Sequence, residues 1–477
     1  MGQHMVTAVD PSVPLSGARK AGYGVGIYGI FVAWMMTAIT LMNFYTEILG
    51  LSAQQAGMIF FIAAFWDAFT DPVMGWINDR VQTRWGRYRP WLLFAAVPFA
   101  ASFAAMFWKP QLGTAADMFL WALVLHLVFR TFYTAVYMPY TAMIARLSTN
   151  GRERSSLAGV KNIFTSAAAL TISFLIFDAI EYFGRGAAPE EADAQGFWMV
   201  AVIIACTAVL ALWLCFFFTK EPPLSDREIA EKKSGQKATS TDIKSLLSNR
   251  AFWLVFFAVI AFTGCYTIIN KAIVYYSQWN LGDRTLAKYS LTAIGLAGIV
   301  SPFFWVPISR ARGKATTWIL GCLLASAALA TIYFAGDMSI AVRTALFFLT
   351  GCGIHAVLMT FYAALADAAD FGEWKSGTRV EAPLFGMVSF ANKISLGIGA
   401  WALGVGLESA GYVGSMQATA QTPETLEAIR MWMTLVPISG ILLSAVIIYF
   451  WPVGNKLHAE IESELQQRNR DYESNAA

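Results

Sequence analysis

The feature that most constrains this 477-residue chain is a series of long apolar runs, each about as long as a membrane-crossing helix. A helix needs about 20 mostly apolar residues to cross the hydrocarbon core of a bilayer. Twelve such runs follow one another, with approximate limits of 22–48, 52–78, 89–108, 115–146, 155–183, 196–219, 250–279, 285–308, 314–336, 339–369, 382–410 and 425–453. They predict an all-α integral membrane protein with twelve transmembrane helices.

The composition supports a lipid environment. Of all residues, 57% are hydrophobic and 14% are charged, whereas soluble proteins have roughly 45–50% apolar and about 25% charged residues. In water such a chain would expose large apolar areas and aggregate. A soluble enzyme, a nucleic-acid-binding protein and a disordered chain are therefore poor interpretations. Each of the five cysteines lies inside an apolar run, so we expect small buried side chains rather than a disulfide framework or a zinc site.

The longest polar stretch divides the apolar runs into two sets of six. We expect bundles at 22–219 and 250–453, joined by a linker at 220–249 and flanked by tails at 1–21 and 454–477. Most Lys and Arg residues lie in loops on the side of the N-terminus, so the positive-inside rule predicts that both termini and the linker are cytoplasmic. The first twenty residues lack the apolar core of a signal peptide.

Glycines are frequent at the start of the first run. Residues 24–29 match the G-x-G-x-x-G spacing, but they open an apolar span and follow no strand, so a dinucleotide site is not expected. We expect Gly22, Gly26 and Gly29 to let this helix approach a neighbouring helix closely instead.

Two carboxylates lie in the second run, where charge is costly. Asp67 and Asp71 are four residues apart and therefore project from one face of a helix. At ~4 Å and an effective dielectric near 20, two such charges repel by about 4 kcal/mol. One of them is then protonated, or a cation lies between them, and Thr70 adds a neutral oxygen. The alternative is that both acids pair with basic residues of neighbouring helices as a scaffold.

Four basic residues lie at membrane depth and outnumber these two acids. They are Arg130, Lys161, Lys271 and Lys393. The imbalance predicts an anionic partner from outside the protein. The alternative for Lys161 and Lys271 is that each side chain extends to a membrane interface.

Residues 66–91, WDAFTDPVMGWINDRVQTRWGRYRPW, carry a long motif. The segment FYTEILGLS precedes this motif, and the segments LADAADFGEWKSGTRVEAP and ANKISLGIGA follow it in that order. Together they resemble the glycoside–pentoside–hexuronide:cation symporters, a branch of the major facilitator superfamily that includes the melibiose carrier. The resemblance covers about residues 20–455 and implies two six-helix bundles, a central cavity and alternating access.

The resemblance also implies site residues. A coupling-cation site would be formed by Asp67, Thr70, Asp71 and Thr134, with Na⁺ or H⁺ as the ion. Lys393 matches a lysine between the cation and sugar sites. A cytoplasmic gate would include Asp79, Arg80, Arg87 and Arg89, and we add Asp367 and Asp370 because they lie at the cytoplasmic end of the tenth run.

Three positions depart from the melibiose branch. Phe31 and Tyr137 stand where acidic side chains bind the sugar, and Lys271 stands where a small residue is usual. These changes make the substrate site more positive, so we expect it to be formed by Phe31, Arg130, Tyr137, Lys161, Lys271 and Lys393, and to bind an acidic glycoside or hexuronide.

The sequence therefore predicts a cation-coupled sugar symporter of the inner membrane, acting as a monomer without a cofactor. A symporter of a neutral glycoside or pentoside is the first alternative, and a lysolipid carrier of related ancestry is the second. An enzyme is not expected, because the four histidines form no metal-ligand pattern and no nucleophile and base lie at a recognisable spacing.

Overall fold

The computed structural model describes residues 15–81, 83–148, 150–188, 191–221, 246–336, 338–377, 381–414 and 420–476. The chain forms two compact units. Unit 1 comprises Met1–Gly235, Ser277–Lys288 and Gly411–Gln421, and unit 2 comprises Gln236–Tyr276, Tyr289–Ala410 and Thr422–Ala477.

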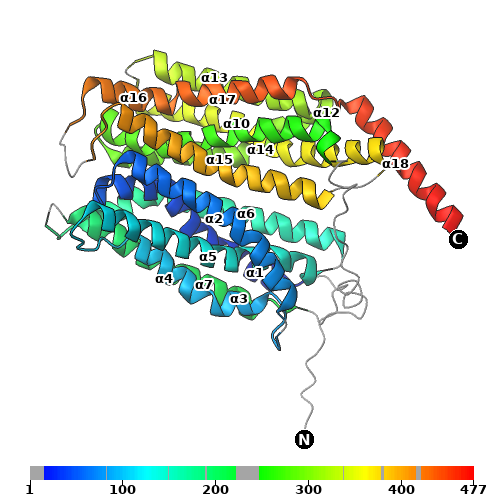
Figure 1. Ribbon diagram of the computed structural model, residues 1–477, viewed down its shortest axis with the longest axis horizontal. Helices are drawn as coiled ribbons and strands as arrows, with labels where there is room; N and C mark the ends of the chain where they lie inside the picture. The colour runs from blue at the N-terminus through cyan, green and yellow to red at the C-terminus, as the bar shows by residue number, and fades with distance from the viewer. Residues whose placement is uncertain are drawn as a thin grey trace, which may run out of the picture. The chain divides into compact units, whose positions relative to one another are not determined.

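Long helices make up unit 1 (Figure 1). They are α1 (Gly17–Asn43), which continues as the π-helix η1 (Phe44–Ile48), α2 (Ala53–Arg80), α3 (Arg89–Phe94), α4 (Ala96–Met106), α5 (Ala115–Leu147), α6 (Gly151–Gly184) and α7 (Ala192–Phe218). Helix α1 packs on α6 and α7, and α2 packs on α5. The short η3 (Arg284–Leu286) also belongs to this unit.

Unit 2 is again helical. Its elements are α10 (Arg250–Tyr275), α12 (Pro302–Arg312), α13 (Lys314–Phe334), α14 (Ile340–Ser376), α15 (Glu381–Ser409), α16 (Pro423–Met433), α17 (Leu435–Tyr449) and α18 (Asn455–Ala476). The π-helix η2 (Tyr276–Asn280) and α11 (Ala287–Val300) run across the boundary between the units. Helix α10 packs on α15 and α17, and α13 packs on α14.

Within the described residues, ten helices are long and apolar enough to cross a membrane, or up to eleven if a bent pair counts as one span. The bent pair joins Arg284–Val300 to Pro302–Arg312 at 50°, where Pro302 starts a new helix. The run expected at 89–108 forms two shorter helices, α3 and α4, which are separated at Ala95. The all-α membrane fold is thus confirmed, whereas the count of twelve stays a prediction.

Local sequence signals explain where several spans begin. The Ser52 hydroxyl accepts a hydrogen bond from the Gln55 N–H while the Gln55 side chain accepts one from the Ser52 N–H, which forms a capping box at the start of α2. Thr114 caps α5 through the Asp117 N–H. Because these caps bind backbone N–H groups that have no partner within the helix, they fix the first residues of α2 and α5.

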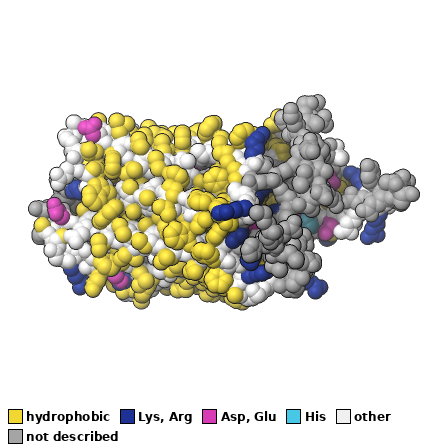
Figure 2. Space-filling model, turned by 90° about the horizontal axis from the view of Figure 1, so that it is seen from below, with side chains coloured by type: hydrophobic (Ala, Val, Ile, Leu, Met, Phe, Trp, Pro, Cys, Tyr) yellow, Lys and Arg dark blue, Asp and Glu magenta, His cyan; other side chains and the backbone are white. Residues whose placement is uncertain are grey.

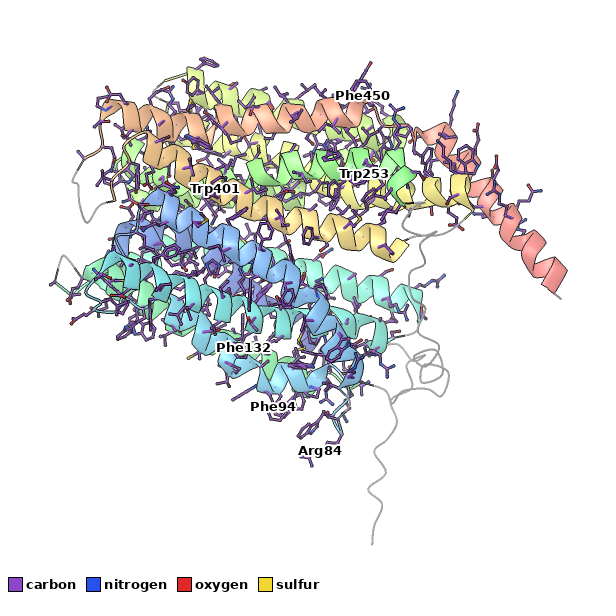
Figure 3. The ribbon with its side chains drawn as sticks, in the orientation of Figure 1. Arg84, Phe94, Phe132, Trp253, Trp401 and Phe450 are labelled. Carbon is purple, nitrogen blue, oxygen red and sulfur yellow. The ribbon has the colours of Figure 1, made fainter. Side chains whose placement is uncertain are left out.

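Apolar side chains cover the middle of the helices on the face shown in Figure 2, and charged side chains lie toward the ends. Phe94 and Phe450 point outward from their helices (Figure 3) and are 61% and 55% exposed. Such exposure suits a surface covered by lipid.

The glycines of α1 do permit close approach. A Cβ atom on Gly26 would lie 2.8 Å from the Cys215 Sγ atom of α7, and one on Gly29 would lie 2.5 Å from the Cβ atom of Ala211. The expectation of tight packing through these small residues is therefore confirmed, and it holds α1 in the position from which Trp34 reaches the site described below.

Candidate functional site

A buried ion pair lies at the centre of the α2–α5 contact. Arg130 Nη1 of α5 donates a hydrogen bond to Asp67 Oδ2 of α2 at 2.6 Å. Asp67 is 2% exposed and Arg130 is 8% exposed. The structure thus gives Arg130 a carboxylate partner within the protein. For Asp67, this contact agrees with the alternative that the acid pairs with a basic residue of a neighbouring helix.

Asp71, the second acid of the pair, lies on the next turn of α2, opposite the next turn of α5. Thr134 Oγ1 donates to Asp71 Oδ1 at 3.2 Å, so the two contacts join residues with the same spacing along the chain, Asp67 to Arg130 and Asp71 to Thr134. The Thr70 hydroxyl donates to the backbone oxygen of Asp67 at 3.4 Å. The residues predicted for the cation site therefore do lie together. Because the guanidinium already compensates Asp67, the repulsion expected between the two acids is reduced.

The Arg130 guanidinium is held by further groups. Its Nε atom donates to His126 Nε2 at 3.2 Å, and its Cζ atom lies 4.7 Å from the centroid of the Trp34 ring. His126 is fully buried, and its Nδ1 atom lies 3.3 Å from the Tyr45 hydroxyl. The two ring nitrogens of His126 thus face different partners, Nε2 the Arg130 guanidinium and Nδ1 the Tyr45 hydroxyl.

The role of His126 is not apparent from its type alone. The signal that could have found it is its position four residues before Arg130, since the two side chains share one helical face.

A row of aromatic rings continues from this ion pair. Trp34 stacks on Tyr133 with centroids 4.7 Å apart, and Tyr133 stacks on Tyr137 at 5.3 Å. Lys161 Nζ of α6 lies 5.8 Å from the Tyr137 ring centroid. Phe31 is half-buried and lies one turn before Trp34 on α1. The structure thus places Phe31, Tyr137 and Lys161 in unit 1, with the Lys161 ammonium group over the Tyr137 ring.

Lys271 and Lys393 both belong to unit 2. Lys271 is 4% exposed on α10, and Lys393 is half-buried on α15. The two helices are joined beside Lys393, where Thr263 Oγ1 donates to Asn392 Oδ1 at 2.8 Å. The two lysines therefore lie on helices that pack on each other.

The loop between α2 and α3 is organised around Glu221. Its carboxylate accepts hydrogen bonds from three successive backbone N–H groups, those of Arg87 at 2.9 Å, Tyr88 at 2.8 Å and Arg89 at 2.7 Å. Gly86 has φ +109°, and a Cβ atom there would come within 3.0 Å of this carboxylate. Glu221 thus fixes the predicted gate loop, and sequence analysis missed it because Glu221 merely resembles a linker residue.

The arginines of this loop bind carbonyl groups. Arg87 Nε donates to the Asn78 oxygen at 2.6 Å, and Arg89 Nη2 donates to the Phe216 oxygen at 2.7 Å. Arg80 packs over the Trp76 ring at 3.7 Å. The side chain of Asp79 lies outside the described residues.

The gate acids of unit 2 lie on α14. Both oxygens of Asp367 accept from Lys314 Nζ at 2.5 Å, and Oδ1 lies 3.0 Å from His458 Nε2 of α18. Asp367 is 4% exposed, whereas Asp370 is half-buried. Asp367 therefore connects three helices of its unit.

A second buried acid lies at the other end of unit 1. Glu47 of η1 is 1% exposed and accepts from Gln278 Nε2 at 2.8 Å and from the Tyr412 hydroxyl. Asn43 Nδ2 donates to Gln278 Oε1 at 2.9 Å. Sequence analysis missed Glu47, although an acid at the end of an apolar run was the signal that could have revealed it.

The described residues contain no group of three or more His, Cys, Asp or Glu side chains that could hold a metal ion. At the expected cation site, the Arg130 guanidinium binds Asp67 Oδ2 and the Thr134 hydroxyl binds Asp71 Oδ1, so each carboxylate has a partner within the protein.

The family model described as MFS/sugar transport protein matches residues 22–455. The chain belongs to this family. This family fits the helical units and the deep charges, and it makes the chain a multi-span sugar symporter of the inner membrane and not an enzyme.

Similar proteins agree with this family. The chain is 31% identical to the isoprimeverose transporter of Lactiplantibacillus pentosus, over 95% of this chain and 92% of the other. It is 26% identical to the glucuronide carrier protein homolog of Escherichia coli, over 96% and 97%. An inward-open structure of the xylose transporter XylE from E. coli has a TM-score of 0.64 at 12% identity, covering 94% of this chain and 98% of that one. At that identity the likeness concerns the fold alone.

Proposed function

We propose that this sugar symporter carries an acidic sugar, such as a hexuronide or another glycoside with an anionic group. The observation that carries the proposal is the row of three rings in unit 1, which begins at Trp34 and ends at Lys161. Aromatic rings pack against the apolar faces of sugars, and an ammonium group binds a carboxylate or sulfonate. Among the described residues, Lys161 has no carboxylate partner, whereas Arg130 has Asp67.

The roles of individual residues follow from this arrangement. We assign Tyr137 and Phe31 to the sugar ring and Lys161 to its acidic group. In unit 2, taken by itself, we assign Lys271 and Lys393 to the binding of an anionic group. Asp71 and Thr134 are assigned to the coupling cation. Two relatives are named for acidic sugars, the glucuronide carrier homolog and the putative sulfoquinovose importer of Salmonella typhimurium at 27% identity, and both support an acidic substrate.

A neutral glycoside is the second candidate. The relative that is 31% identical is named for isoprimeverose, a sugar without an acidic group. In that case Lys161 would donate hydrogen bonds to hydroxyl groups, which contribute less than bonds between charged partners.

Uptake into vesicles tests the proposal. The purified protein is reconstituted, and uptake of a glucuronide is compared with uptake of the matching glucoside under an imposed cation gradient. We expect saturable uptake of the glucuronide. Lys161→Met should raise its KM about 10- to 100-fold, because a hydrogen bond between charged partners contributes about 1.5–3 kcal/mol, while Lys161→Arg keeps the charge and much of the affinity. Uptake of the glucoside alone would overturn the proposal.

A further inference from the structure

The Arg130 guanidinium occupies the side of Asp67 that a small cation would need. Its Nη1 atom is 2.6 Å from Asp67 Oδ2, a short charge-assisted contact in a place where both groups are almost fully buried. The negative charge of Asp67 is therefore balanced by the side chain of Arg130, so this carboxylate needs no free cation.

Several contacts prevent the guanidinium from leaving easily. His126 accepts from Nε, and the Trp34 ring covers the guanidinium carbon atom. The Tyr45 hydroxyl in turn fixes His126. The side chain is thus bound through a carboxylate, an imidazole and an aromatic ring, and a competing cation would have to break all three contacts.

A metal cation next to this pair meets two difficulties. A second positive charge a few ångströms from the guanidinium is repelled, and at an effective dielectric near 20 the repulsion weakens binding at least about a hundredfold. One oxygen of each carboxylate is also engaged, since Asp67 Oδ2 accepts from Arg130 and Thr134 Oγ1 donates its proton to Asp71 Oδ1. A hard cation needs several oxygen atoms directed at it together.

We infer that Arg130 is a selectivity residue that excludes sodium from the Asp67–Asp71 turn and makes sugar uptake independent of sodium. The inference rests on the proposed function as a symporter, since it states which gradient does not drive that symport. Arg130, which the sequence predicted as a substrate-binding residue, would then act on the coupling cation.

The experiment removes the guanidinium and measures sodium dependence. Reconstituted wild-type protein should accumulate sugar under a proton gradient, with no stimulation by an inward sodium gradient. Arg130→Ala opens the Asp67 carboxylate, so 100 mM sodium should increase sugar affinity tenfold or more. Arg130→Lys retains the positive charge and is the matched control, so it should stay independent of sodium.

Direct measurement of sodium binding keeps the test decisive if Arg130→Ala fails to insert. Equilibrium binding of radioactive sodium to the purified wild-type protein should be absent at millimolar concentrations. Sodium-driven uptake or sodium binding by the wild type would overturn the inference, as would an inserted, sugar-binding Arg130→Ala variant without any sodium effect. A wild type that transports no sugar under either gradient would instead refute the proposed function, while the sodium-binding measurement would still decide the inference.

Discussion

Replacing Asp67 by Asn should destabilise the protein far more than the same change one turn later at Asp71. Asp67→Asn leaves the Arg130 guanidinium buried, 8% exposed, without a carboxylate, and removing one partner of a buried pair costs about 3–5 kcal/mol. Asp71 is half-buried and accepts a hydrogen bond from the Thr134 hydroxyl. Asp71→Asn should therefore cost about 0.5–1.5 kcal/mol.

The assay is chemical unfolding in detergent, read as the change in the unfolding midpoint, with the double variant Asp67→Asn/Arg130→Gln completing a cycle. The double variant should recover about 2 kcal/mol relative to Asp67→Asn, because no uncompensated charge stays buried. Equal midpoints for Asp67→Asn and Asp71→Asn would refute this reasoning, as would a double variant no more stable than Asp67→Asn.

Three further predictions concern the ends of the helices. Glu221→Ala removes the acceptor of three backbone N–H groups in the loop before α3, so limited trypsin digestion should cut this loop faster, and an unchanged rate would contradict the role of the carboxylate. Glu47→Gln places an amide donor against the Gln278 amide donor and should lower the unfolding free energy by about 1–3 kcal/mol, which an unchanged midpoint would disprove. Asp367→Asn weakens the contact with α18, so hydrogen exchange in α18 should accelerate, whereas equal protection would show that α18 is held by other contacts.

The sequence predicted the features that depend on local patterns. The apolar runs gave the helical membrane fold, and the four-residue spacing of Asp67 and Asp71 correctly placed both acids on one helical face. The glycines of α1 were likewise understood from spacing alone. Helix ends were less predictable, since α3 and α4 interrupt one expected span and Pro302 starts a new helix inside another.

The pairing of side chains could not be predicted, because it depends on how helices distant in sequence are rotated against each other. Asp67 and Arg130 are 63 residues apart, and a rotation of either helix by one residue would have directed Arg130 elsewhere. The pattern of charges correctly showed that Arg130 needed a partner, but it could not distinguish a substrate anion from a protein carboxylate. Glu221 was missed for the same reason, since its three donors come from a loop 132–134 residues earlier.

The charges of the candidate site in unit 1 make a final prediction about coupling. Asp67 and Arg130 cancel, and Asp71 and Lys161 carry opposite charges, so these four side chains sum to zero. A coupling cation adds one positive charge and an acidic sugar adds one negative charge, which means that these four side chains and their ligands sum to zero in both the empty and the doubly loaded state.

With only one ligand bound, this group of four side chains in unit 1 carries one net charge, which costs about 2.5–3.5 kcal/mol at the bilayer centre on insertion scales and reduces the reorienting population about a hundredfold. Symport of one cation with one acidic sugar should therefore be tightly coupled and electroneutral. A potassium diffusion potential across the vesicle membrane, imposed without any other gradient, should not drive accumulation of a glucuronide. The matching neutral glucoside is the control, since its symport would move one positive charge and respond to the potential. Accumulation of the glucuronide driven by the potential alone would show that this charge balance does not govern the transport cycle.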